Sequence, residues 1–406
     1  MNKTIVLLVM ILASAASHMA SDLYAPSLPH LPELLNTTPE WVKLTLGLNV
    51  LAFGLIQLVY GPLSDRFGRR PLFLVAIVMF SISSLMCGFA DNVYELLIWR
   101  ILQGMSAGAG AVLVLAVITD VFSSHQRVRA LAIYGGVLAI APALAPTLGG
   151  YIHVNLGWQY NFYLLATLTG VIAIFALYYL SETSTQPRMV LKASNVLSNY
   201  KALLKDRAFV GYALLTSCAL GSVFAFVTAG PFILISNFGV ATEHFGFYQL
   251  VTVVFFMVGS GISVSLTKKI SPRCLLGVGL GLFVLGAAIL VFVSTSNMLS
   301  PLSLVFIVGI IYMGLGPVFA VAPSLAMNTK SAPSGAAAAM LGSLEMVGPT
   351  LAATAISVFH DGTAQPYAWT VAITAIVALA IFFIILRRQD FIEQPVPENI
   401  TLAEYR

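Results

Sequence analysis

Twelve long apolar stretches, each separated from the next by a short polar segment, run through the whole chain. They lie at 4–27, 41–62, 71–90, 94–119, 130–152, 160–181, 208–236, 243–266, 274–296, 301–326, 334–358 and 366–387. A helix needs about 20 residues to cross a hydrocarbon core of ~30 Å, and every stretch is of that order. Hydrophobic residues make up 59% of the 406 positions, which is more than the roughly 45–50% of a soluble domain. We therefore expect an all-α integral membrane protein with twelve transmembrane helices.

One polar break is longer than the others and carries five Lys and Arg residues. It predicts an N-terminal six-helix bundle at 1–181, a cytoplasmic linker at 182–207, a C-terminal six-helix bundle at 208–390 and a cytoplasmic tail at 391–406. The two halves look like degenerate copies of each other. Such repeats favour two pseudo-symmetric bundles that rock about a central site.

The distribution of basic residues predicts the orientation of the helices. If the N-terminus is inside, eighteen of the twenty Lys and Arg residues lie in the tails or in the even-numbered loops. The exceptions are Lys43, which lies outside, and Arg100, which lies within the membrane. Because basic residues concentrate on the cytoplasmic side, we expect both termini to be cytoplasmic.

The sequence also excludes several classes of function. It contains no nucleotide-binding loop of the Walker type, no metal-binding cluster of His and Cys and no nucleophile elbow. Its three cysteines lack metal-ligand spacing, and it has no basic and aromatic patch typical of nucleic-acid binding. We therefore predict no cofactor, no metal and no nucleic-acid partner, and expect an ion gradient or the substrate's own gradient to supply the energy.

Three charged residues fall inside apolar stretches, namely Asp22, Arg100 and Glu345. A charge in the middle of a bilayer costs at least ~2.5–3.5 kcal/mol, so each one calls for an explanation. Asp22 and Arg100 are expected at similar depth. Either they form a fixed salt bridge, or the Asp22 carboxylate titrates under the influence of Arg100. His18 lies on the same helix face as Asp22 and either relays a proton or hydrogen-bonds the carboxylate.

Four residues are candidates for the wall of a substrate cavity. Glu345 either binds a cationic substrate, carries a second proton, pairs with an unidentified donor or faces a wet cavity. The aromatic candidates are Tyr24, Tyr134 and Phe226. Each of these aromatic residues has ordinary helix packing as the alternative explanation.

Five short motifs stand out: Asp22-Leu-Tyr-Ala-Pro-Ser-Leu-Pro29, Gly61-Pro-Leu-Ser-Asp-Arg-Phe-Gly-Arg-Arg70, Arg100-Ile-Leu-Gln-Gly104, Ala141-Pro-Ala-Leu-Ala-Pro-Thr-Leu-Gly-Gly150 and Ala229-Gly-Pro-Phe232. Together they resemble the motifs of the drug:proton antiporters of the Bcr/CflA type, within the major facilitator superfamily. The second and third are typical of the superfamily, the fourth of its antiporters, and the first and last of the Bcr type. The resemblance covers essentially the whole chain.

The resemblance implies a role for each matched position. Asp22 is expected to be the proton-coupling carboxylate, and Arg100 its electrostatic modulator. Prolines in span five are expected to let it bend and pack at the bundle interface, with Pro142, Pro146, Gly149 and Gly150 as the antiporter motif. A cytoplasmic charge network is expected to latch the two bundles in one state. Its expected members are Gly61, Asp65, Arg66, Gly68, Arg69, Asp120 and Arg129.

These observations predict a proton-driven exporter that works by alternating access as a monomer in the bacterial inner membrane. Its expected partners are protons, the lipid bilayer and a small amphipathic substrate, either a drug, an antibiotic or an endogenous metabolite. A proton-coupled importer on the same fold is the alternative. An intramembrane enzyme or sensor is a remote alternative, because His18 and Asp22 form the only polar pair of the kind that an enzyme would need.

Overall fold

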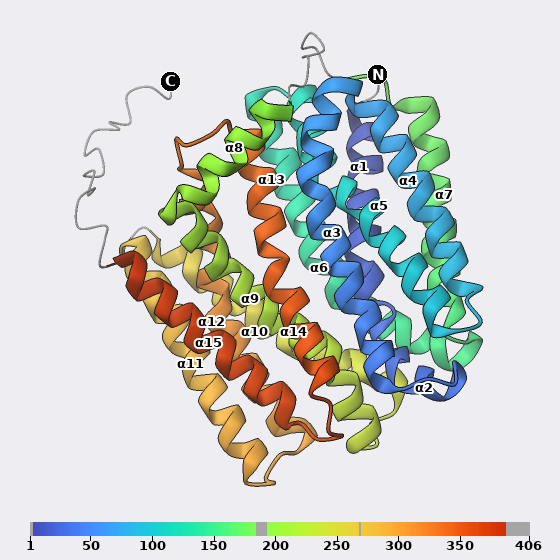
Figure 1. Cartoon of the computed structure of the whole chain (residues 1–406), viewed down its shortest axis with the longest axis vertical. Helices are drawn as coiled ribbons and strands as arrows, with labels where there is room; N and C mark the ends of the chain where they lie inside the picture. Colours follow the sequence, from blue (N-terminus) through green and yellow to red (C-terminus); the bar gives the residue numbers. More distant parts are fainter. Residues whose placement is uncertain (1–2, 184–192, 268, 387–406) are drawn as a thin grey trace.

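Figure 1 shows the computed structural model of the chain, which describes residues 3–183, 193–267 and 269–386. Within these ranges, twelve helical segments are long and apolar enough to cross a membrane. The prediction of an all-α membrane protein with twelve spans in two bundles is confirmed. The domain boundaries and the orientation of the termini stay predictions.

The first six spans form the N-terminal half. Their helices are α1 (Lys3–Asp22), η1 (Ala25–His30), α2 (Leu31–Leu34), α3 (Pro39–Phe67), α4 (Arg69–Gly88), α5 (Val93–Val121), α6 (Ser124–Leu156) and α7 (Gln159–Tyr179). Helix α3 packs against α5 and α4 against α7, while α1 contacts α5, α6 and α7. In Figure 1 this half lies to the right, with α3 facing the other half.

The last six spans form the C-terminal half. Their helices are α8 (Ala193–Lys205), α9 (Arg207–Pro231), η2 (Phe232–Asn237), η3 (Thr242–His244), α10 (Phe245–Leu266), α11 (Pro272–Thr295), α12 (Pro301–Met327), α13 (Ser334–Glu345), α14 (Val347–Val358) and α15 (Gln365–Leu386). Helix α8 lies in the predicted linker and was not expected as a helix. The Tyr200 hydroxyl of α8 donates a hydrogen bond to the Leu58 carbonyl of α3 at 2.8 Å, so the linker contacts the N-terminal half.

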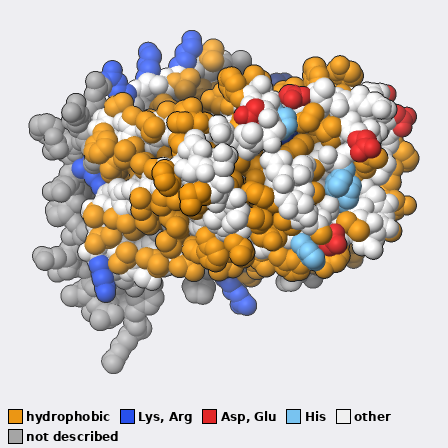
Figure 2. All heavy atoms as spheres, turned by 90° about the horizontal axis from the view of Figure 1, so that it is seen from below, with side chains coloured by type: hydrophobic (Ala, Val, Ile, Leu, Met, Phe, Trp, Pro, Cys, Tyr) orange, Lys and Arg blue, Asp and Glu red, His pale blue; other side chains and the backbone are white. Residues whose placement is uncertain are grey.

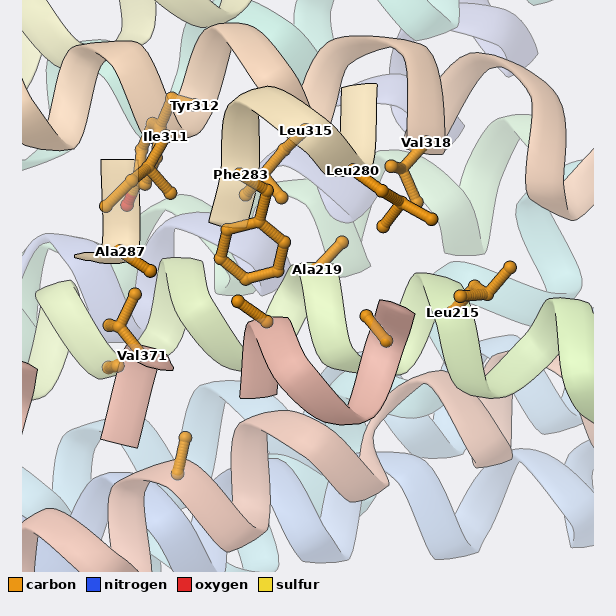
Figure 3. Packing of buried hydrophobic residues seen from close by; sticks show 14 of the residues in the cluster. Leu215, Ala219, Leu280, Phe283, Ala287, Ile311, Tyr312, Leu315, Val318 and Val371 are labelled. Atoms are coloured by element: carbon orange, nitrogen blue, oxygen red, sulfur yellow. The ribbon is translucent and has the colours of Figure 1, made fainter. Parts of the chain in front are cut away.

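The largest apolar core lies in the C-terminal half. Figure 3 shows part of it, where side chains of α9, α11, α12 and α15 converge. Phe283 of α11 lies at the centre of this view, and Leu315 of α12 and Ala219 of α9 pack around it. Burial of such side chains in lipid-exposed bundles depends on close packing, which the small residues of these helices permit.

Three spans are interrupted near a proline, although the sequence analysis treated them as continuous. The first span ends its regular helix at Asp22, the seventh at Pro231 and the eleventh at Glu345. A proline lacks the N–H donor, and its ring clashes with the carbonyl four residues earlier. Pro26 and Pro349 stand four residues after Asp22 and Glu345, so each acid lies where its helix breaks.

The two halves touch along two helix pairs. Helix α3 runs beside α13 and α14, where a Cβ atom on Gly54 would lie 2.5 Å from the Cβ atom of Met346. Helix α6 packs against α10 and η3, where a Cβ atom on Gly150 would lie 2.6 Å from the Thr242 carbonyl oxygen. Such close backbone approach is typical of small residues at membrane helix interfaces.

The end of the molecule that holds α2, hereafter the α2 end, is acidic. Figure 2 is seen from this end and shows carboxylates and histidines gathered on it, with Lys and Arg only along the margin of the view. Its exposed carboxylates are Glu33, Asp91, Glu95 and Asp361. The distribution of charges is the one that the predicted periplasmic side should have.

The two halves are joined at the α2 end by hydrogen bonds between residues far apart in sequence. The Ser357 hydroxyl of α14 donates to the Glu40 carbonyl of α3 at 2.6 Å. The His30 Nε2 atom of η1 lies 2.9 Å from the Thr242 hydroxyl of η3. This end is therefore closed in the present arrangement.

Candidate functional site

Arg100 is the most deeply buried charge among the described residues, and it lies in α5 with its side chain against the end of α1. Its Nη1 atom donates to the Gln103 side-chain oxygen at 2.5 Å and to the Ala20 carbonyl at 3.3 Å. Its Nη2 atom donates to the Ser21 hydroxyl at 3.3 Å, and its guanidinium carbon lies 5.2 Å from the centre of the Tyr24 ring. A buried charge is tolerated when such acceptors surround it.

The partners of Arg100 belong to a wider polar network within the N-terminal half. Gln103 donates to the Ser84 hydroxyl of α4 at 2.8 Å, and Asn49 of α3 donates to the Arg100 carbonyl at 2.7 Å. Ser21 donates to the Asn49 side-chain oxygen at 3.4 Å. The network joins α1, α3, α4 and α5. Arg100 was predicted from the sequence but its partners were not, although Gln103 stands within the same motif.

Asp22 does not form an ion pair with Arg100 in this arrangement. Its carboxylate lies at the last residue of α1, half-buried, and faces the other half of the molecule. The Gln249 side-chain amide of α10 lies 3.5 Å from it, at the long limit of a hydrogen bond. Tyr312 of α12, which is labelled in Figure 3, also lies close enough to interact with its charge. Neither Gln249 nor Tyr312 was identified from the sequence.

The Gln249 side chain is only partly satisfied at this position. Its oxygen is buried and has no hydrogen-bond partner among the residues that the structure describes. Its amide group contacts only the carboxylate of Asp22 in the same set. A protonated Asp22 could donate to that oxygen, whereas an ionised Asp22 can accept only from the amide group. Protonation of Asp22 would thus add a donor opposite this unpartnered oxygen.

His18 lies one turn before Asp22 but does not bind it. Its Nδ1 atom lies 2.8 Å from the Ser14 carbonyl, and its ring contacts the Phe53 ring at 5.9 Å between centres. A carbonyl accepts only, so Nδ1 carries the proton and Nε2 is left as an acceptor or a second donor. The direct hydrogen bond to the carboxylate that the sequence left open is not made here, and the proton-relay role stays a prediction.

The three aromatic candidates for the cavity wall are buried in contacts between helices. The Tyr24 hydroxyl lies 3.3 Å from the Thr45 hydroxyl, and the Tyr134 hydroxyl lies 3.2 Å from the Ser14 hydroxyl. The Phe226 ring packs against another aromatic ring of α15 at 6.0 Å. In this arrangement they pack helices together, which was the alternative explanation for each.

Glu345, the fourth candidate, lies at the break between α13 and α14 and is partly exposed. Its carboxylate forms no hydrogen bond or ion pair with any residue in the described ranges. The chain just after it is held by the Gly348 N–H group, which donates to the Ser217 hydroxyl of α9 at 2.7 Å. The carboxylate is therefore presented without a fixed partner at a firmly anchored helix break.

The predicted latch forms a charge cluster inside the N-terminal half. Arg69 lies 2.8 Å from the Asp65 carboxylate and 3.5 Å from the Asp120 carboxylate, and so it joins α3, α4 and α5. Glu182 accepts hydrogen bonds from the backbone N–H groups of Arg69 and Arg70 at 2.9 and 3.3 Å.

Two expected members of the latch lie elsewhere. Arg66 lies over the adjacent Phe67 ring at 5.1 Å, and Arg129 is exposed on α6. Arg69, rather than Arg66, bridges the two acids because the chain reverses at Gly68, whose φ is 97°. Gly61 lies at the interface, where an added Cβ atom would contact the Ala339 Cβ atom at 3.7 Å.

The antiporter motif of α6 lies where the halves meet at the α2 end. Gly149 lies against the Leu23 carbonyl so closely that any side chain there would collide with it. Asn161 of α7 donates to the Gly149 carbonyl at 3.4 Å. Pro142 and Pro146 lie within α6, which continues through both of them. The glycines therefore hold α6 tightly against the end of α1, directly after Asp22.

Comparison with known proteins agrees with the motifs. The chain matches the Major Facilitator Superfamily over residues 10–348. It is 29% identical to the uncharacterized MFS-type transporter YdgK of Bacillus subtilis (strain 168), over 89% of this chain and 90% of that one. It is 24% identical to a bicyclomycin resistance protein homolog of Haemophilus influenzae, over 90% and 92% of the two chains. The multidrug resistance protein MdtL of Salmonella typhi is 27% identical over 81% and 82%.

Solved structures show the same fold. A bacterial homolog of the human lysosomal transporter Spinster, in an inward-facing and unoccupied conformation, gives a TM-score of 0.75 at 14% identity over 94% of this chain and 96% of that one. A D-xylose-proton symporter gives 0.69 at 17% identity over 94% and 97%. The resemblance to the Bcr/CflA type is confirmed by the named relatives. This chain belongs to the Major Facilitator Superfamily, and it is a multi-pass membrane transporter and not an enzyme.

Proposed function

We propose that this transporter is a proton-coupled antiporter that exports small amphipathic compounds by alternating access. It acts as a monomer in the bacterial inner membrane, with both termini in the cytoplasm and with 1–181 and 208–390 as the two moving bundles. The position of Asp22 carries the proposal. It is an intramembrane carboxylate of one half that contacts Gln249 of the other half, so its surroundings change whenever the halves move.

Burial and exposure of Asp22 couple proton binding to that movement. A carboxylate that is removed from water binds a proton more readily, whereas contact with water or with a cation favours its ionised form. When the α2 end opens, Gln249 withdraws with α10 and water reaches Asp22. A cationic or strongly polar substrate that enters the cavity competes with the proton for the same carboxylate. Proton and substrate then occupy the carrier in turn, as an exchange mechanism requires.

Arg100 sets the field at Asp22 without a direct ion pair. Its hydrogen bonds to Ala20 and Ser21 hold the positive charge beside the two residues that precede Asp22. Because Arg100 is bound within the N-terminal half, the charge stays in place while the other half moves. It limits how strongly Asp22 holds its proton, and so it allows release after each cycle.

The names of the relatives support export as the direction. One is a bicyclomycin resistance protein homolog and another a multidrug resistance protein. Resistance by a transporter requires movement of the compound out of the cell. The glycine contacts of the antiporter motif at the α2 end support the same direction, since the motif resembles that of exchangers.

Reconstitution in liposomes tests the proposal. A growth-inhibition panel that includes bicyclomycin and ethidium, with and without the gene in an efflux-deficient host, first identifies a transported compound. The purified transporter is then placed in liposomes with an imposed pH gradient and a pH-sensitive dye inside. We expect substrate and protons to move in opposite directions. Movement in the same direction would show an importer of the symport type instead.

A further inference from the structure

A cavity of about 270 Å³ lies at the α2 end between the two halves. The N-terminal half contributes residues of η1, α2 and α3 to its wall, and the C-terminal half contributes α9, η2, α14 and the start of α15. Its volume is near the lower limit of about 300 Å³ for small-molecule pockets. It is separate from Asp22, Arg100 and Glu345, none of which lines it. The proposed transport mechanism therefore assigns no role to this cavity.

The wall of the cavity contains a buried ammonium group that has no hydrogen-bond acceptor among the described residues, although Glu40 and Asp361 lie near enough for their charges to act on it. Lys43 of α3 is only 1% exposed, and its Nζ atom lies 4.3 Å from the centre of the Phe232 ring. No hydrogen bond or ion pair of Lys43 occurs within residues 3–183, 193–267 and 269–386. An ammonium group has three donors, and a buried one is costly unless acceptors surround it. The cavity is the space from which an acceptor can reach it.

A second buried donor lines the same cavity. Tyr367 of α15 is 1% exposed, and its ring packs against Phe226 at 6.0 Å. Its hydroxyl has no hydrogen-bond partner in the part of the chain that the structure describes. Lys43 belongs to the N-terminal half and Tyr367 to the C-terminal half, so the two donors approach the cavity from opposite sides of the interface. An occupant that accepts from both would bridge the halves.

Carboxylates near the cavity limit the charge of such an occupant. Glu33 lines the cavity and is exposed, as is Asp361, which stands between two lining residues, and Glu40 near Lys43 is partly exposed, so water screens all three. Burial, followed by the charge of Lys43, lowers the pKa of His360, which also lines the cavity. His360 is therefore neutral at pH 7 and adds no second positive charge. One buried ammonium group next to several acids suits a single negative charge, and not a dianion such as phosphate.

We propose that this cavity binds a small monocarboxylate with an apolar or aromatic body. The carboxylate accepts from Lys43 and Tyr367, and the body packs against Phe232, Pro29 and Pro366, which also line the cavity. Because the ligand would contact both halves where they are closed, its binding favours this closed arrangement of the α2 end. With the α2 end on the periplasmic side, as proposed above, an organic acid outside the cell would thus hold this end shut. The proposal is independent of the direction of transport and of proton coupling.

Equilibrium binding of radiolabelled benzoate to the purified full-length transporter in lipid nanodiscs tests the site. We expect saturable binding to the wild type that unlabelled benzoate displaces and neutral benzamide does not. Lys43→Met should weaken the affinity at least tenfold, whereas Lys43→Arg should retain most of it. Lys201→Met removes an exposed lysine of α8 at the opposite end and should bind benzoate as the wild type does.

Tyr367→Phe provides a second variant, because it removes only the hydroxyl and keeps the ring on Phe226. We expect it to weaken benzoate binding several-fold, and it keeps the test decisive if Lys43→Met fails to fold. Absence of saturable benzoate binding to the wild type would overturn the proposal, and so would wild-type affinity in either variant. Since the assay needs no transport, a negative result here leaves the proposed antiport unaffected.

Discussion

Asp22 of the first span and Glu345 of the eleventh stand at similar helix breaks but differ in their surroundings. Each acid stands four residues before a proline, and in each case the regular helix ends at the acid. Around Asp22, the N-terminal half places Arg100 and its polar partners, and Gln249 reaches across from the other half. Glu345 has no hydrogen-bond partner among the described residues. The two breaks are alike, but Asp22 has one partner from the other half, Gln249, whereas Glu345 has none in the described ranges.

The difference suggests that the two acids have different roles in transport. An acid whose contacts change with the bundle movement suits proton coupling, because its proton affinity changes with conformation. An acid with no protein partner keeps its charge available for a ligand. We therefore interpret Asp22 as the coupling group and Glu345 as a group that selects cationic substrates. The following variants test that contrast, from the largest expected effect to the smallest.

Asp22→Asn should abolish proton-driven transport. The amide keeps the size of the side chain and its contact with Gln249, but it can neither bind nor release a proton. We expect uphill transport in liposomes with a pH gradient to fall to the level of protein-free liposomes, while binding of neutral substrates is retained. Glu345→Gln is the matched control and should keep proton coupling. Undiminished uphill transport by Asp22→Asn would refute the role given to Asp22.

Arg100→Met should destabilise the N-terminal half as well as slow transport. Loss of the guanidinium leaves the Gln103 and Ser21 side chains and the Ala20 carbonyl without their partner, at about 1–3 kcal/mol for each buried group left unsatisfied. We expect a lower thermal unfolding midpoint and a marked loss of transport. Arg100→Lys should recover part of the stability but less of the transport. A midpoint equal to that of the wild type in Arg100→Met would contradict the buried network.

Glu345→Gln should change substrate preference and leave proton coupling intact. Loss of this unpartnered carboxylate should weaken cation binding about tenfold, or about 1.4 kcal/mol. We expect a higher KM for cationic compounds such as ethidium and an unchanged KM for neutral ones. Competition assays with matched cationic and neutral substrates measure this. Equal losses for both kinds of substrate would assign Glu345 a structural role.

Pro349→Ala should have the smallest effect on transport. The alanine N–H group can bond to the Glu345 carbonyl, so α13 and α14 should become more continuous and the carboxylate should shift. We expect a partial loss of transport of cations, smaller than that of Glu345→Gln, with stability equal or increased. Pro26→Ala is the equivalent change beside Asp22 and should affect all substrates alike. A selective loss of cation transport in Pro26→Ala would break the contrast between the two acids.

Much of the candidate site could be predicted from the sequence, but not its contacts. Asp22 and Arg100 were found because a charge inside an apolar stretch is costly. Their direct pairing was left open, and the structure instead turns Arg100 toward Ser21 and Ala20. In the latch, both Arg66 and Arg69 were expected members, but only Arg69 lies beside the two acids. Side-chain direction at a helix end depends on one or two backbone angles, which motifs do not specify.

The helix breaks could have been predicted from the positions of the prolines. The prolines at 26, 231 and 349 stand in the sequence, yet long apolar stretches around them favoured continuous helices. Proline is common in membrane helices, because neighbouring helices can satisfy the freed backbone groups. Here Ser217 does so by accepting from the Gly348 N–H group. Hydropathy averaged over a window cannot distinguish a break from a continuous span.

The pattern of apolar stretches and charges was sufficient for the number of spans and the identity of the costly intramembrane charges, and the short motifs were sufficient for the family. These are local properties, since the cost of placing a residue in lipid depends on that residue and its near neighbours. Packing alone decided which side chains meet. Asp22 and Gln249 are 227 residues apart, and the cavity at Lys43 exists only because two separately folded halves close over it. Such contacts depend on how whole helices pack together, and no short stretch of sequence specifies that packing.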